Sequence, residues 1–379
     1  MIQLKGIAWN HTRGFTSLVA TAQRYEELNP SVRITWEKRS LQAFADMPLQ
    51  ELINQFDLLI MDNPHVTLAA QDQLLLPFND YVSEAFLNEL AHHSVGKSHA
   101  SYHVFNKQWT LATDAATPIA TWREDLVQQL DFQIPQTWQQ LIEVTKKGKV
   151  AFASIPIDTL MHHYMMCIAL GAPIFKSQTE LAPRALMIEA IKTYKTLVDL
   201  APSYCLQMNP IQIYERMTQT DEIVYSPFNY GYSNYSKKNY ANHVLKAGGL
   251  VTFNGKRLRS TLGGAGIAIS SKTKHAETAM QYAQFVASEK IQSGLYFEFG
   301  GQPGHRKSWL CDEVNAQCKD FFKDTLQTLD EATMRPQYYG YMHFQDEASL
   351  LIHEAVSGKS PIASVVDKIN LIYKESLTH

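Results

Sequence analysis

The sequence predicts an α/β protein with more than one domain, and three observations support this. Its 379 residues are long for a single hydrophobic core. Hydrophobic residues make up 45% of the chain and charged residues 19%, which is typical of a folded globular protein. Short apolar strands alternate with helical patterns through the first 61 residues, and this order is typical of a parallel sheet covered by helices.

The first 61 residues show the clearest alternation. We expect strands at Ile2–Trp9, Val32–Trp36 and Phe56–Met61, and helices at Gly14–Leu28 and Pro48–Phe56. The third strand is almost wholly apolar, which predicts a strand buried on both faces of its sheet. The first helix ends just before a proline, because proline disfavours helical geometry in the residue that precedes it.

The rest of the chain continues the alternation less regularly. Thr137 follows Pro135 and is a suitable N-cap for a helix, and Ser360 is a suitable N-cap for the last helix. We expect further strands at Leu111–Trp122, Val150–Ser154, Glu222–Tyr230 and Ile267–Ile269. We expect further helices at Ile155–Leu170, Ala185–Ala201, Glu277–Ser293 and Pro361–Tyr373.

Polar and aromatic residues follow each of the three amino-terminal strands. In parallel sheets, ligands bind beyond the carboxyl ends of the strands. A structural loop would carry mainly glycine, serine and proline, so these residue types indicate a binding edge. The candidates are Trp9, His11, Trp36, Arg39, Asp62, Asn63 and His65.

Composition argues against several kinds of partner. The formal net charge is −3, whereas nucleic-acid binding needs a concentrated basic face. No apolar run is long enough to span a membrane. No metal-ligand spacing or cofactor motif is recognised, so we expect neither. Four cysteines are too few for a disulfide framework in a chain of this length, and they are Cys167, Cys205, Cys311 and Cys318.

The amino terminus shows no secretory signal peptide. Ile2–Trp9 enters a strand directly, without a basic region, an apolar stretch and a cleavage site. Two interpretations stay open: either a leader has been removed, or Met1 is the native start and the protein is cytoplasmic.

Seven segments occur in an order that resembles one family. The most specific is Ile134–Leu141, which reads Ile-Pro-Gln-Thr-Trp-Gln-Gln-Leu. The other six are Leu74–Asn79, Trp109–Leu126, Ile223–Asn234, Gly263–Ile269, Gly300–Arg306 and Arg335–Pro336. Together they cover essentially the whole chain and resemble the extracytoplasmic solute-binding proteins of ABC importers, the maltose-binding-like family. Trp122–Leu126 departs from the family's usual Tyr-Asn-Lys-Asp-Leu type sequence, and the missing leader is a second departure.

The resemblance implies a two-lobed α/β architecture, the periplasmic-binding-protein type II fold. It implies about three crossings between the lobes, a ligand cleft between them, and hinge closure on binding. Lobe one is expected to contain residues 1–112 and 266–307, and lobe two residues 113–265 and 308–379. The implied function is capture of a small polar, carbohydrate-like ligand by a monomer, for delivery to an ABC permease. The implied location is periplasmic or cell-surface.

Sugar-like ligands need aromatic faces and side chains that fix hydroxyl groups. The resemblance adds residues of the second lobe and of the later loops to the strand-end candidates, namely Asp114, Asp158, His162, Phe228, Tyr230, Tyr232 and Arg306.

Several of these candidates have a structural alternative. Trp36 could belong to the core, and His162 could be a hydrogen-bonded core histidine. Phe228 could serve only the hinge. Asp62 could cap the turn that follows it. Tyr230, like Phe228, could serve only the hinge. Arg39 and Arg306 could be solvated, or could pair with a carboxylate of an anionic ligand.

Two other functions stay open at this point. Some proteins of this fold are transferases with a cysteine nucleophile, but Cys167 lies in an apolar helical context that raises a thiol pKa. We therefore expect no enzymatic activity. The second alternative is a cytoplasmic ligand sensor. Selective alkylation of one cysteine would favour the enzyme, and the upstream genomic sequence would separate the sensor from the importer component.

Overall fold

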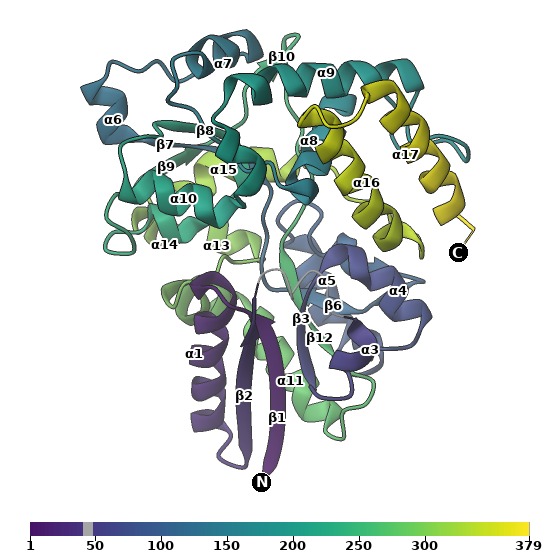
Figure 1. Cartoon of the computed structure of the whole chain (residues 1–379). Helices are drawn as coiled ribbons and strands as arrows, with labels where there is room; N and C mark the ends of the chain where they lie inside the picture. The colour runs from purple at the N-terminus through teal and green to yellow at the C-terminus, as the bar shows by residue number, and fades with distance from the viewer. Residues whose placement is uncertain (41–47, 379) are drawn as a thin grey trace. The chain divides into compact units, whose positions relative to one another are not determined.

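The structure is a computed structural model that describes residues 1–40 and 48–378. It divides into two compact units, whose elements are labelled in Figure 1. Unit 1 comprises Met1–Ala116 and Leu262–Ala316, and unit 2 comprises Thr117–Thr261 and Gln317–His379. The chain therefore passes from one unit to the other three times. The predicted lobe boundaries lie four residues from the first two passages and nine residues from the third, and they stay a prediction.

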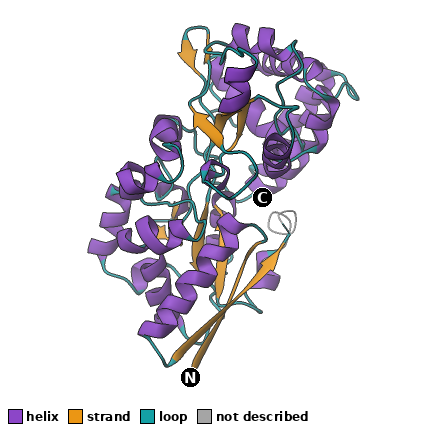
Figure 2. Ribbon diagram, turned by 90° about the vertical axis from the view of Figure 1, so that its left-hand side faces the viewer, coloured by secondary structure: helices purple, strands orange, loops and turns teal. Residues whose placement is uncertain are grey.

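Unit 1 is built on a five-stranded sheet in the order β2-β1-β3-β12-β6. β1 pairs in parallel with β2 and β3, whereas β12 is antiparallel to β3 and β6. Figure 2 shows β1 and β2, each of eight residues, extending from the N-terminus. The strands are β1 Ile2–Trp9, β2 Val32–Arg39, β3 Leu58–Asp62, β4 His103–Val104, β5 Lys107–Gln108, β6 Thr110–Ala112 and β12 Ala265–Ile269. The helices are α1 Thr12–Leu28, α3 Leu49–Leu52, α4 Val66–Gln71, α5 Glu84–His92, α11 Ala276–Ala287, α12 Glu289–Ile291, α13 Arg306–Leu310 and α14 Asp312–Ala316.

The sheet of unit 1 is buried on both faces. Leu58 and Ile60 of β3 belong to the core cluster that contains residues of α1 and α11. Leu59 and Met61 belong to a second cluster, with residues of α3 and α4. Successive side chains of a strand point to opposite faces, so an apolar run is needed to fill both clusters. The predicted burial of this strand on both faces is confirmed.

Unit 2 contains a three-stranded antiparallel sheet in the order β8-β7-β9, and helices account for most of its core. Its strands are β7 Pro118–Arg123, β8 Tyr225–Tyr230, β9 Leu245–Gly248, β10 Thr252–Phe253 and β11 Lys256–Arg257. Its helices are α6 Glu124–Gln129, α7 Trp138–Thr145, α8 Pro156–Ala169, α9 Arg184–Leu200, α10 Pro210–Gln219, α15 Phe321–Asp330, α16 Tyr341–Val356 and α17 Ile362–Ser376.

Helix α8 lies at the centre of the larger core cluster of unit 2. It packs against α16 and α9, and α17 covers α16. Ten of its fourteen residues are buried, which explains why its sequence is apolar on nearly every side. The few polar residues of this helix are therefore held inside the unit.

Two predicted strands are wrong. Residues 111–122 form two strands, because β6 pairs with β12 in unit 1 and β7 pairs with β8 in unit 2. One continuous strand cannot belong to both sheets. Residues 150–154 make a single bridge, Val150 with Tyr225, and the amide of Ala153 donates instead to the side chain of Asn229. The side chain of Asn229 thus accepts the hydrogen bond that a backbone oxygen of β8 would accept if the strand pairing continued.

Several predicted helix ends also differ. The helix expected at Glu277–Ser293 is interrupted, because the extended backbone of Ser288 ends α11 at Ala287 and α12 begins at Glu289. The helix expected at Pro48–Phe56 is shorter, since α3 spans Leu49–Leu52. The last helix has Pro361 as its N-cap instead of Ser360, whose hydroxyl donates to Glu354. The Thr137 N-cap is confirmed, with a reciprocal bond from Gln140.

Candidate functional site

The carboxyl ends of the parallel strands in unit 1 lie at one edge of the sheet. The register pairs Trp9, the last residue of β1, with Arg39, the last of β2. Asp62, the last of β3, pairs with Ala265 at the start of β12. Polar residues that follow these strands are thus brought to a common edge, where α/β sheets hold ligands.

Both tryptophans at this edge are buried. Trp9 is 5% exposed and Trp36 is 9% exposed, and both belong to the core cluster beside α1 and α11. The indole N–H of Trp36 donates to the Tyr282 hydroxyl at 3.1 Å. This contact gives Trp36 a structural role in the core of unit 1.

His11 has a defined structural task at this edge. It is the N-cap of α1, and its Nδ1 accepts a hydrogen bond from the amide of Arg13 at 3.0 Å. An accepting Nδ1 carries no proton. Burial, together with the positive charge of Arg13, lowers the pKa of His11 to about 3. The ring is therefore neutral at physiological pH.

Arg13 also forms a buried ion pair that the sequence did not reveal. Its Nε donates to Asp114 Oδ2 at 2.7 Å, and its Nη2 contacts Oδ1. Burial raises the pKa of Asp114, and the charge and hydrogen bonds of Arg13 offset part of that rise. Asp114, predicted to bind ligand, thus holds the start of α1 to the segment after β6. Its distance of 101 residues from Arg13 explains why no local pattern indicated the pair.

Asp62, Asn63 and His65 form one short turn at the end of β3. Asp62 is the N-cap of the 3₁₀ turn Asn63–His65, and its Oδ1 accepts from the amide of Asn63 at 2.8 Å. Asn63 is buried, whereas Asp62 and His65 are half-buried. Arg39 is also half-buried, and burial lowers its pKa to about 10. Asp62 therefore caps its turn through one oxygen while part of its surface stays exposed.

In unit 2, two polar side chains lie next to the segment that precedes α8, namely Asn229 of β8 and Asp158 of α8. This segment runs parallel to β8, and Ala153 donates to Asn229 Oδ1 at 2.7 Å near the end of β8. Asp158 follows in the first turn of α8 and is 4% exposed. Burial raises the pKa of Asp158 to about 7. Sequence reasoning found Asp158 and missed Asn229.

His162 and Phe228 lie in the core of unit 2. The Nδ1 of His162 is 2.9 Å from the Tyr194 hydroxyl, and the ring also hydrogen-bonds to the backbone of Phe228. Burial lowers the pKa of His162 to about 3. The ring of Phe228 is fully buried and stacks on Trp138 with a centroid separation of 6.5 Å. These contacts favour the structural alternative for both residues.

Tyr230 and Tyr232 lie where β8 runs into its aromatic loop. The Tyr230 hydroxyl is 3.1 Å from Thr261 Oγ1, and the residue is half-buried. Tyr232 is 8% exposed and makes an edge contact with Tyr214. Of the two, Tyr230 has more surface with which to contact a ligand.

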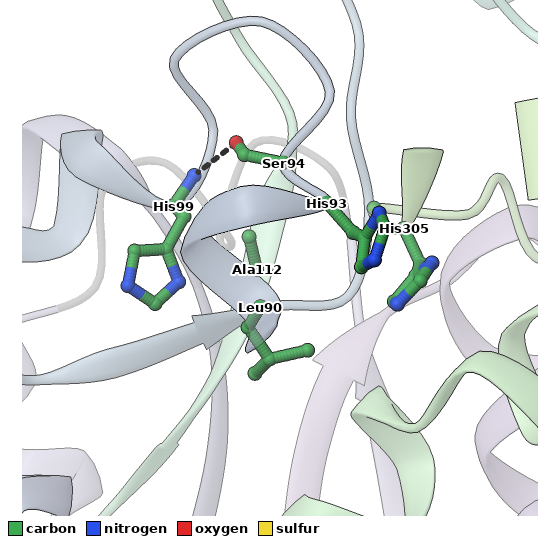
Figure 3. Close-up of a pocket in the computed structure, with 7 residues that line it drawn as sticks. Leu90, His93, Ser94, His99, Ala112 and His305 are labelled. Carbon is green, nitrogen blue, oxygen red and sulfur yellow. Dashed lines mark hydrogen bonds between the residues drawn. The ribbon is translucent and has the colours of Figure 1, made fainter. Parts of the chain in front are cut away.

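A small pocket in unit 1 is lined by three histidines (Figure 3). His93, Ser94 and His99 come from the chain after α5, and His305 precedes α13. The rings of His93 and His305 stack with centroids 5.3 Å apart. Arg306, predicted to bind ligand, donates through Nε to the backbone oxygen of Ser94 at 3.0 Å.

Burial lowers the pKa of two histidines that line this pocket, His93 and His99. Burial, with the charge of His103, lowers the pKa of His99 to about 4. His305 Nε2 is 3.0 Å from Glu89, and its Nδ1 accepts from the amide of Lys307 as the N-cap of α13. The pocket thus joins the end of α5 to the start of α13, and it was not indicated by the sequence.

Three of the four cysteines are buried thiols with a raised pKa. Burial raises the pKa of Cys205 to about 11 and that of Cys318 to about 12, and it raises the pKa of Cys167 further. Within residues 1–40 and 48–378, no group of three or more His, Cys, Asp or Glu is arranged to hold a metal ion. No helix in those ranges has the length and hydropathy needed to cross a membrane.

Comparison with known proteins decides the family. The model of the bacterial extracellular solute-binding protein family matches residues 8–293. The chain belongs to this family. Membership makes it a solute-binding protein and not an enzyme, and it confirms the resemblance seen in the sequence.

Solved structures confirm the two-lobed fold of this solute-binding protein. A maltose-bound MalE3 of T. maritima is 15% identical with a TM-score of 0.85, over 99% of this chain and 100% of that one. A ribitol complex from Agrobacterium radiobacter K84 is 16% identical with a TM-score of 0.82, over 99% and 98%. A cycloalternan complex from Listeria monocytogenes is 13% identical with a TM-score of 0.84, over 100% and 99%.

Proposed function

We propose that this protein captures a carbohydrate or polyol outside the cytoplasm and delivers it to an ABC permease. The observation that carries the proposal is family membership over residues 8–293. Similar structures are named with maltose, ribitol and cycloalternan, which supports a hydroxyl-rich ligand. A monomeric state and closure by a hinge stay predictions.

The proposed contacts come from both units. In unit 1 they are Asp62, His65 and Arg39, which retain exposed surface at the carboxyl edge of the sheet. In unit 2 they are Asp158 and Tyr230, at the end where β8 finishes. Carboxylates and amides accept and donate the hydrogen bonds that sugar hydroxyls need, and Tyr230 can cover a C–H face.

A thermal-shift screen tests this proposal. The probes are maltose, ribitol, tagatose, glucosamine and glucuronate, which vary size and charge on a common hydroxyl-rich chemistry. A ligand present at a hundred times its Kd stabilises the folded protein by about 2.7 kcal/mol, so a binder should raise the melting temperature by several degrees. If none of the five probes raises it, the proposal is contradicted.

A further inference from the structure

Among residues 1–40 and 48–378, two aspartates are almost wholly buried, and their surroundings differ. Asp114 in unit 1 is held by two bonds from Arg13. Asp158 in unit 2 is 4% exposed, and its Oδ2 accepts no hydrogen bond from any of the residues that the structure describes. Burying an unpaired carboxylate is costly, so a fold that keeps one there points to a partner from outside the chain.

A complementary donor lies at the same end of the sheet. Asn229 is 1% exposed, and its Oδ1 accepts the amide of Ala153, whereas its Nδ2 donates to none of the described groups. Ala153 ends the segment beside β8, and α8 begins three residues later at Pro156. An unsatisfied acceptor and an unsatisfied donor are thus held on neighbouring parts of one unit.

We propose that Asp158 and Asn229 form a polar subsite that binds a hydroxyl or amino group of an uncharged or cationic ligand, and that rejects anionic ligands. This inference rests on the proposed function and specifies its substrate class. A hydroxyl group can donate to Asp158 and accept from Asn229 at the same time, which satisfies both groups. A carboxylate on the ligand would instead face the Asp158 carboxylate, and like charges repel.

The subsite also predicts how pH controls binding. An ionised carboxylate accepts hydrogen bonds more strongly than a protonated one. Burial raises the pKa of Asp158 to about 7, so the group ionises across the neutral range. Helix dipole stabilisation in the first turn of α8 acts in the opposite direction. Tyr194 of α9 interacts electrostatically with Asp158, and the Tyr194 hydroxyl also contacts His162 Nδ1 of α8.

The first test uses protein without ligand. Wild type, Asp158→Asn and Asp131→Asn are melted at pH 5 and pH 8. Asp131 is an exposed aspartate of the same unit, so it controls for the change in net charge. We expect Asp158→Asn to gain several degrees over wild type at pH 8 and little at pH 5, while Asp131→Asn follows wild type. An equal difference at both pH values would overturn the proposal.

The second test measures affinity for whichever of the five probes raises the melting temperature most. For wild type, affinity should rise roughly five- to tenfold from pH 5.5 to pH 8, since binding favours the ionised form. In Asp158→Asn the change should be less than about twofold. The inference fails if the variant keeps the wild-type pH dependence, or if glucuronate alone binds. Absence of any binder would contradict the proposed function and this inference together, whereas the other outcomes concern the subsite alone.

Discussion

At the scale of single residues, burial separates the candidate contacts from residues that shape the fold. Trp36, His162 and Phe228 were predicted as contacts, yet each has its partners inside its own unit. Asp62 and His65 keep exposed surface at the edge of the unit 1 sheet. The same residue types can therefore pack inside a unit or remain exposed as candidate ligand contacts, and only their packing in the structure distinguishes the two roles.

Asp62 is the sharpest test at this edge. Asp62→Asn keeps an oxygen that can cap the amide of Asn63, so stability should change by less than about 0.5 kcal/mol. Charge-assisted hydrogen bonds are about twice as strong as neutral ones, so affinity for a sugar hydroxyl should fall. Isothermal titration and a melting curve measure the two effects. A drop in stability with unchanged affinity would make Asp62 a turn residue only.

Phe228 should behave in the opposite way. Its ring is fully buried between Trp138, Phe152 and His162. Phe228→Ala should therefore lower the free energy of unfolding by about 3–5 kcal/mol through cavity formation. Affinity should change little at a temperature where the variant is folded. Denaturant unfolding and titration test this, and a large loss of affinity with full stability would place Phe228 in the site.

At the scale of elements, the sequence predicted those helices and strands that depend on interactions between neighbouring residues. The periodicity of residues 2–62 predicted β1, α1, β2 and β3 because each is an amphipathic or apolar run. The same reasoning failed at residues 111–122, where the strand divides because its halves pair with different sheets. It also failed at Ala153, whose partner is a side chain 76 residues away. Pairing between distant segments leaves no trace in a short window of sequence.

The capping box at the start of helix α7 is a local feature whose contribution to stability can be measured. Thr137 Oγ1 accepts from the amide of Gln140, and Gln140 Oε1 accepts in turn from the amide of Thr137. Thr137→Ala should cost about 1 kcal/mol of unfolding free energy. Gln139→Ala, on the exposed side of the same helix, should stay within about 0.5 kcal/mol. If the two variants unfold alike in urea, the capping box does not stabilise the helix.

At the scale of the whole molecule, buried histidines make the stability of both units depend on pH. Burial lowers the pKa of His11 to about 3 and of His99 to about 4 in unit 1. It lowers the pKa of His162 and His163 to about 3 in unit 2. The unfolded chain takes up protons near pH 6.5 while the folded chain does not, so stability falls as pH drops below 6.5. By pH 5, each histidine should cost about 2 kcal/mol.

Two buried aspartates oppose this loss, because burial raises the pKa of Asp114 in unit 1 and of Asp158 in unit 2. The pKa of Asp158 is raised from 3.8 to about 7, so its penalty is present above pH 7 and decreases as pH falls toward 4. Between pH 7 and pH 5 it should return about 2–3 kcal/mol, which offsets about one histidine. In native-state hydrogen exchange, corrected for intrinsic rates, Asp158→Asn should therefore lose more protection in α8 and α16 between pH 7 and pH 5 than wild type does, while the unit 1 strands change alike in both proteins. Equal losses in α8 and α16 of the two proteins would contradict the prediction.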